Sequence, residues 1–104
     1  MNPNKYGLTG KMKAKPGKGN EMVAILLEAS KLVSTAKGLH LYIVSTDAAD
    51  SDVVHVTEVW DSKADHDSSL QLPGVKELIS QAMPLIDSKP EGAVLEVLGG
   101  KGLG

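Results

Sequence analysis

The stretch VVHVTEVWDSKADHDSSL, from Val53 to Leu70, decides the fold because it takes the chain from a strand into a helix. Branched and aromatic residues dominate Val53–Trp60, which is typical of a strand. Glu58 and Trp60 are two residues apart, so both side chains project from the same strand face. Asp61 or Ser62 can then cap a helix whose acidic residues lie near its positive end.

The segment before this stretch completes a hairpin. Leu39–Thr46 is also rich in branched and aromatic residues. The polar run DAADSD separates it from the strand that ends at Trp60. Two such segments joined by a polar loop predict a pair of antiparallel strands.

Periodicity predicts the elements on either side of the hairpin. Residues 6–15 alternate as a half-buried strand, and Pro16-Gly17 ends it. Asn20 can cap a helix that ends near Gly38, because apolar residues then recur every three or four positions: Met22, Ile25, Leu26, Ala29 and Leu32.

Beyond Leu70, Pro73-Gly74 predicts that the second helix is broken in two. The part after the break again carries an apolar stripe, formed by Val75, Leu78, Ile79, Ala82 and Met83. Ala93–Leu98 then predicts a last, edge-like strand.

The resulting order predicts an α+β fold of the ferredoxin-like β-α-β-β-α-β type, with an antiparallel sheet and both helices on one face. A chain of 104 residues forms one domain, 1–104, for which we expect flexible ends at 1–5 and 99–104. The strand Val53–Trp60 has apolar residues on both faces. The uncovered face therefore predicts a homodimer in which two sheets pack together.

Composition excludes several functions. All eleven basic residues are lysines and the net charge is −2, so no basic stripe is available for nucleic acid. The chain has no cysteine, which excludes thiolate chemistry and disulfides and fits a cytoplasmic location. Its longest apolar run, Met22–Leu27, is too short for a membrane anchor. The three histidines are fifteen and eleven residues apart, which argues against a metal site.

Three segments carry a resemblance to a known family. TEVWDSKAD, the following SSLQLPGVK and the closing AVLEVL, in this order of elements, resemble the antibiotic biosynthesis monooxygenases over nearly the whole chain. The resemblance implies a dimeric α/β barrel, with a pocket between sheet and helices in each protomer. It also implies oxygenases that act on quinols or anthrones with dioxygen and without metal or flavin, or haem-degrading enzymes.

Only some of the functional residues of this family have a counterpart in this sequence. Trp60 matches the family tryptophan, which can wall an aromatic substrate. The asparagine and tyrosine of the anthrone-oxidising members correspond here to Val56 and His66, and the histidine of many quinol-type relatives corresponds to Ser69. Aligned to the haem degraders, the chain offers Ser69 for tryptophan and Ile79 for the haem ligand, which argues against haem degradation.

The candidate site therefore combines Trp60 with titratable and polar side chains. His66, six residues after Trp60, is the candidate base at the pocket mouth, or else an exposed helix residue. Tyr42 and Ser69 are expected to bind substrate. His40, which shares a strand face with Tyr42, and His55 face either the pocket or the dimer interface. We interpret Glu58 as a dimer contact or an ion pair with a lysine.

Two functions follow from this sequence. The first is a cofactor-independent monooxygenase that acts on a small quinol- or anthrone-like substrate, with Trp60 and His66 as its catalytic residues. The alternative is a non-catalytic dimer of the same fold that binds or senses a small hydrophobic ligand.

Overall fold

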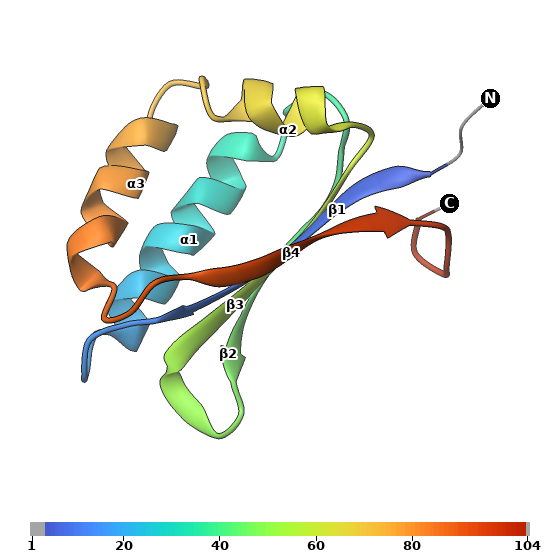
Figure 1. The fold of residues 1–104 in the computed structure, drawn as a ribbon. Helices are drawn as coiled ribbons and strands as arrows, with labels where there is room; N and C mark the ends of the chain where they lie inside the picture. Colours follow the sequence, from blue (N-terminus) through green and yellow to red (C-terminus); the bar gives the residue numbers. More distant parts are fainter. Residues whose placement is uncertain (1–3, 104) are drawn as a thin grey trace.

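The computed structural model describes residues 4–103. Its elements follow one another as β1 (Lys5–Lys13), α1 (Gly19–Val33), β2 (Leu39–Asp47), β3 (Asp50–Trp60), α2 (Lys63–Ser69), α3 (Val75–Ala82), the short 3-10 helix η1 (Met83–Leu85) and β4 (Glu91–Val97). The four strands form one antiparallel sheet in the order β2-β3-β1-β4. The helices all lie on one face of this sheet, so the fold is the predicted ferredoxin-like α+β arrangement (Figure 1).

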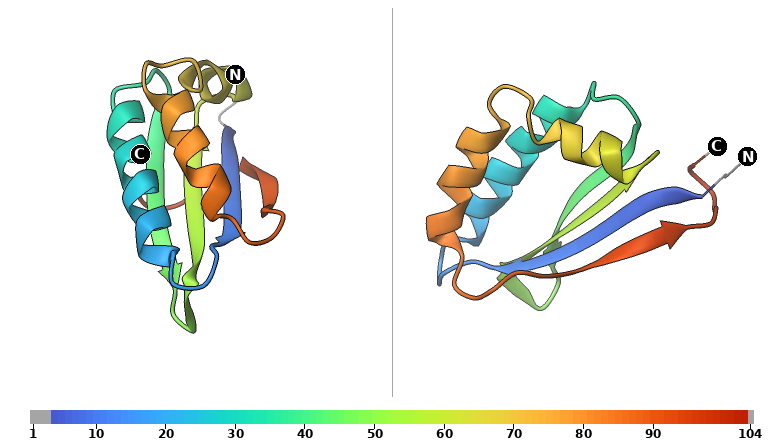
Figure 2. Two further views of the ribbon diagram at one scale, coloured as in Figure 1. Left: turned by 90° about the vertical axis from the view of Figure 1, so that its left-hand side faces the viewer. Right: turned by 45° about the horizontal axis from the view of Figure 1, so that its top comes forward.

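The other face of the sheet carries no helix (Figure 2). Alternation along β3 and its pairing with β1 and β2 place Leu41, Ile43 and Thr57 on this uncovered face. Ile43 and Leu95, on β2 and β4, are each 45% exposed. The strand β4 is exposed at every residue except Val97, which is half-buried.

Two buried clusters hold the helices on the sheet. Met22 and Val54 are fully buried at one end, together with Ala14 and Ala82. Trp60 is fully buried at the other end and packs with Val33 and Val75. Because Val54 and Trp60 come from the helix-facing side of β3, this single strand contributes to both clusters.

Local sequence explains how the second helical segment is divided. The side chain of Ser62 accepts a hydrogen bond from Asp65 N (3.2 Å), so Ser62, and not Asp61, is the cap of α2. Gly74 then has φ +91°, a left-handed conformation that favours glycine, and it separates α2 from α3. The predicted break after Leu70 is confirmed.

Several predicted boundaries differ. Asn20 lies inside α1, which begins at Gly19. The residue at the cap position is Lys18, so the predicted cap is wrong. The hairpin loop is shorter than DAADSD, because β2 and β3 extend to Asp47 and from Asp50. The predicted flexible ends lie partly outside the described residues. Within them, Lys5 belongs to β1 and pairs with Val97, whereas residues 99–103 form no helix or strand.

Candidate functional site

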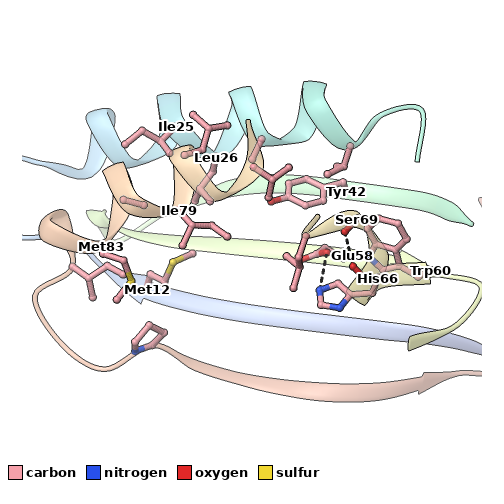
Figure 3. A pocket seen from close by; sticks show the side chains of 18 residues that line it. Met12, Ile25, Leu26, Tyr42, Glu58, Trp60, His66, Ser69, Ile79 and Met83 are labelled. Atoms are coloured by element: carbon pink, nitrogen blue, oxygen red, sulfur yellow. Dashed lines mark hydrogen bonds and ion pairs between the residues drawn. The ribbon is translucent and has the colours of Figure 1, made fainter. Parts of the chain in front are cut away.

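A cavity of about 270 Å³ lies between the helices and the helix-facing side of the sheet (Figure 3). Its lining comes from α1, β1, β2, β3, α2, α3 and η1, and most of its residues are aliphatic. The polar side chains among them are Tyr42, Glu58, Trp60, His66 and Ser69. These five converge on one end of the cavity (Figure 3).

The register of the sheet explains why the polar groups of the strands meet. Glu58 is the cross-strand neighbour of Tyr42 on β2 and lies two residues before Trp60 on β3. Side chains of directly paired residues lie on the same sheet face, so all three project toward the helices. Their convergence follows from two local rules, alternation along β3 and its pairing with β2.

Glu58 joins these groups. The indole Nε1–H of Trp60 donates a hydrogen bond to Glu58 Oε1 (2.9 Å). The same oxygen lies 4.0 Å from His66 Nε2, and the two side chains are only 16% and 18% exposed. Burial, followed by the nearby charge of Glu58, raises the pKa of Tyr42 to about 12. Tyr42 therefore keeps its hydroxyl proton at neutral pH and can donate it in a hydrogen bond.

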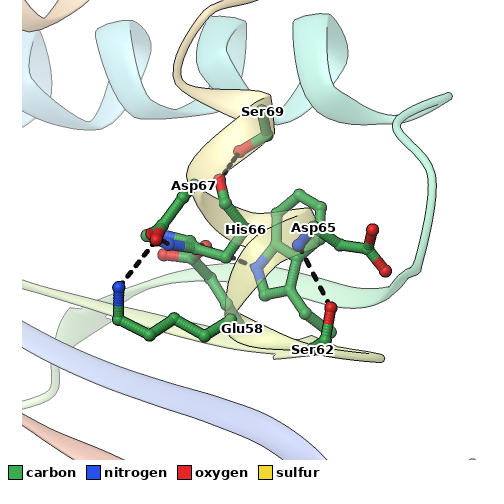
Figure 4. A network of polar contacts seen from close by, with 8 residues as sticks. Glu58, Ser62, Asp65, His66, Asp67 and Ser69 are labelled. Atoms are coloured by element: carbon green, nitrogen blue, oxygen red, sulfur yellow. Dashed lines mark hydrogen bonds and ion pairs between the residues drawn. The ribbon is translucent and has the colours of Figure 1, made fainter.

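His66 lies between two carboxylates (Figure 4). On one side its Nδ1 is 3.0 Å from Asp67 Oδ1. Hydrogen bonds from Lys63 (2.7 Å) and His66 lower the pKa of Asp67, so its carboxylate is ionised and acts as an acceptor. In the neutral imidazole, Nδ1 must then carry the proton, which leaves the lone pair on Nε2, the nitrogen nearer Glu58.

Aromatic contacts fix the ring of His66 further. Its centroid lies 5.8 Å from that of Trp60 in an edge-to-face arrangement and 5.7 Å from that of Tyr6. Ser69 is 4% exposed, and its hydroxyl donates to the carbonyl oxygen of His66 (2.6 Å). Ser69 thus supports the turn that carries His66, and its own oxygen can still accept a hydrogen bond.

The structure brings four of the predicted residues to the cavity: Trp60, Tyr42, His66 and Ser69. It places His40 and His55 elsewhere. A β-bulge between Leu39 and Leu41 separates His40 from the face of Tyr42, and His40 Nε2 lies 2.6 Å from Asp61. His55 alternates with Glu58 onto the uncovered face, where its Nε2 lies 3.3 Å from Asp47 Oδ1.

The structure contradicts the interpretation of Glu58 as a dimer contact or an ion pair with a lysine. It lies in the cavity, and the partner of its carboxylate is the indole of Trp60 rather than a lysine. The spacing of two between Glu58 and Trp60 was the available signal. Within residues 4–103, no group of three or more histidine, aspartate, glutamate or cysteine side chains could hold a metal ion. No helix in the same range has the length and hydropathy of a membrane span.

Comparison with known proteins agrees with this fold. The family model described as antibiotic biosynthesis monooxygenase matches residues 6–81. A Chloroflexus aurantiacus protein described as a "putative Antibiotic biosynthesis monooxygenase" is 40% identical, with a TM-score of 0.81, over 96% of this chain and 99% of its own. No match was found among the curated proteins.

Two further solved structures show the same fold at low identity. A Caulobacter crescentus protein described in the same words as the Chloroflexus protein is 18% identical, with a TM-score of 0.84, over 92% of each chain. A conserved protein from Methanosarcina mazei is 16% identical, with a TM-score of 0.82, over 90% of this chain and 93% of its own.

Proposed function

The chain belongs to the antibiotic biosynthesis monooxygenase family, and we propose that it oxygenates a small phenolic substrate of the quinol or anthrone type with dioxygen, without metal or flavin. The observation that carries the proposal is the meeting of Trp60, Glu58 and His66 at the polar end of an otherwise apolar cavity. A base, a charge that stabilises its protonated form and a wall for an aromatic ring are the groups that this chemistry needs.

His66 Nε2 is the proposed base. It removes a proton from a phenolic hydroxyl, or from the acidic carbon of an anthrone, and the imidazolium that forms lies between the carboxylates of Glu58 and Asp67. Opposite charges at these distances stabilise the protonated ring. Trp60 is the proposed wall for the substrate ring, and its own orientation is fixed by the hydrogen bond to Glu58.

The substrate anion then supplies all the electrons. It passes electrons to dioxygen, and a carbon–oxygen bond forms to give a peroxide, whose O–O bond breaks. One oxygen atom remains on carbon and the other leaves as water, so that a hydroquinone becomes a hydroxyquinone and an anthrone becomes an anthraquinone. Neither reaction requires an external reductant. Tyr42, which is neutral up to high pH, can donate a hydrogen bond to the substrate oxygen.

The same proposal includes a homodimer formed through the sheets. The uncovered face carries the exposed side chains of Ile43 and Leu95, and β4 is almost entirely exposed. A second copy of this chain would bury both. The cavity lies on the opposite, helix-covered side of the sheet, so this interface would not cover it.

Oxygen uptake tests the proposal. The purified protein, treated with a chelator and free of flavin, is given a panel of hydroquinones and anthrones, and oxygen consumption is compared with product formation. We expect one dioxygen consumed per product. His66→Ala and His66→Gln should each reduce turnover by at least about a hundredfold, because general-base catalysis contributes roughly 10²–10⁴-fold. His40→Ala, whose side chain lies outside the cavity, is the matched control.

One observation favours the alternative, a non-catalytic binding protein. Two polar hydrogens at this end of the cavity are already used inside the protein, that of Trp60 by Glu58 and that of Ser69 by the carbonyl of His66. A panel in which compounds bind but none is oxidised would support this alternative. Oxidation at equal rates in wild type and both His66 variants would instead remove His66 from the mechanism.

A further inference from the structure

The two ends of the cavity differ in chemistry. The hydroxyl, carboxylate, indole and imidazole groups described above occupy one end, whereas Met12, Ile25, Ile79 and Met83 lie at the other (Figure 3). Ile86, which pairs with Ala14 just after β1, and Pro90, which precedes Glu91 opposite Lys11, also line the cavity at this end. We call the set of Met12, Ile79, Met83, Ile86 and Pro90 the aliphatic end, and it contains no polar side chain.

We propose that the aliphatic end is a subsite for a saturated hydrocarbon chain, attached to the substrate ring at a position that directs it away from the reacting hydroxyl. The substrate class is then a phenol, hydroquinone or anthrone with an aliphatic substituent, rather than a fused polycycle with polar groups on its far ring. The orientation of the ring rests on the proposed function, which places the reacting hydroxyl beside His66.

The spacing along β1 between the two ends of the cavity supports this substrate class. Leu8 on β1 is the cross-strand neighbour of Glu58, and Met12 lies four residues further along the same strand. At the rise of an antiparallel strand, four residues span about 13 Å. That distance exceeds one aromatic ring and leaves room for a short extended chain between the ring and Met12.

The polarity of the lining supports it as well. A fused polycycle with hydroxyl or carbonyl groups on its far ring would bring them against the aliphatic end, where no side chain can form a hydrogen bond to them. Burying a polar group without a hydrogen-bond partner is unfavourable. A hydrocarbon chain meets no such cost. Met12 and Met83 add adaptability, because an unbranched thioether adjusts to chains of different shape.

The aliphatic end also opens toward solvent. Ile79 is 46% exposed and Met83 is 61% exposed, although both line the cavity. A chain longer than the subsite can therefore pass between these side chains without a steric clash. Affinity should rise with chain length until the chain reaches Met83 and then stop rising.

Calorimetric titration of the intact protein without oxygen tests the subsite. The probes are phenol, para-propylphenol, para-hexylphenol and a para-propylphenol with a terminal hydroxyl group. Each buried methylene should tighten binding by about two- to fourfold, so the propyl compound should bind at least about tenfold more tightly than phenol. The terminal hydroxyl should remove most of this gain.

Ile79→Asn should abolish the gain from the alkyl chain, measured as the ratio of the affinities for para-propylphenol and phenol in the same variant. The matched control is Leu27→Asn, because Leu27 has a similar exposure of 48% but does not line the cavity. If Ile79→Asn fails to fold, Met83→Gln, at a more exposed position, should also abolish the gain in affinity from the alkyl chain. Thermal unfolding reports folding for each variant.

An affinity that is independent of chain length would overturn the subsite, and so would an equal gain in wild type and Ile79→Asn. These measurements require no turnover. Absence of oxygen uptake with a clear gain in binding would refute the proposed reaction and leave the subsite standing. Turnover of a hydroquinone combined with an affinity that is independent of chain length would refute the subsite and leave the proposed reaction standing.

Discussion

Neutralising Glu58 tests the proposed chemistry most directly. Glu58→Gln keeps an oxygen that can accept the hydrogen bond of the Trp60 indole, and it removes only the negative charge 4.0 Å from His66 Nε2. The variant should therefore leave the position of Trp60 intact. What it removes is the stabilisation of the imidazolium formed when His66 takes up a proton.

The distance sets the size of the effect. Two unit charges 4 Å apart interact by about 4 kcal/mol at an effective dielectric constant near 20, and by about 1 kcal/mol in bulk water. The two side chains are 16% and 18% exposed, which places them between these limits. We therefore expect a loss of about 1.4 to 2.7 kcal/mol of transition-state stabilisation, or about ten- to a hundredfold in kcat/KM.

The assay is oxygen uptake with whichever hydroquinone or anthrone the wild-type protein oxidises. Asp65→Asn, on the same helix as His66 but outside the cavity lining, is the matched control for loss of a carboxylate. In a double-mutant cycle, Glu58→Gln should cost almost nothing further in a His66→Ala background, because the charge acts through the imidazole. Full activity of Glu58→Gln, or additive losses in the cycle, would refute this reasoning.

The remaining predictions concern Tyr42, Trp60 and the sheet. The folded protein should hold the Tyr42 proton up to a pKa of about 12, so stability gained from its neutral form is complete below pH 10 and lost as pH rises through about 12. Alkaline absorbance titration should show this late ionisation, and Tyr42→Phe should abolish it. A bound quinol should change the emission of Trp60, the only tryptophan; unchanged emission despite independently measured binding would place the ligand elsewhere. Sedimentation at micromolar concentration should give a dimer, and Ile43→Lys with Leu95→Lys a folded monomer; a folded wild-type monomer would contradict the interface.

Much of the fold could be predicted from local rules. Alternation along Val53–Trp60 correctly separated Glu58 and Trp60 from His55, because a strand side chain has only two faces to choose from. Pro73-Gly74 likewise marked the break between α2 and α3. Alternation does not say which face the helices cover, however. The sequence alone therefore left His55 open between the pocket and the dimer interface.

The candidate site was harder, because irregular geometry and partners distant in sequence decide it. The bulge between Leu39 and Leu41 moves His40 away from the face of Tyr42, and nothing in LHLY marks that extra residue. The role of Glu58 depends on α2 folding back over β3, which brings His66 within 4.0 Å of its carboxylate. Asp67 determines the tautomer of His66. In the sequence it is one of several acids in this helix, and nothing there marks it as the partner of His66.

On the proposed function, the polar end of the cavity is suited to catalysis rather than to simple binding. A protein that only binds a hydrophobic ligand would gain affinity from apolar side chains at that end, because charged groups lose hydration when a ligand covers them. Here Glu58 and His66 are mostly buried inside an aliphatic cavity, and Asp67 and Lys63 outside it hold the imidazole in the tautomer that leaves Nε2 free to accept a proton. Such an arrangement would lower the affinity for an apolar ring and would place a proton taken from it between two carboxylates. The polar groups would therefore contribute favourably only when a proton is transferred to His66. Removal of that proton is the step that oxygenation of a phenol requires.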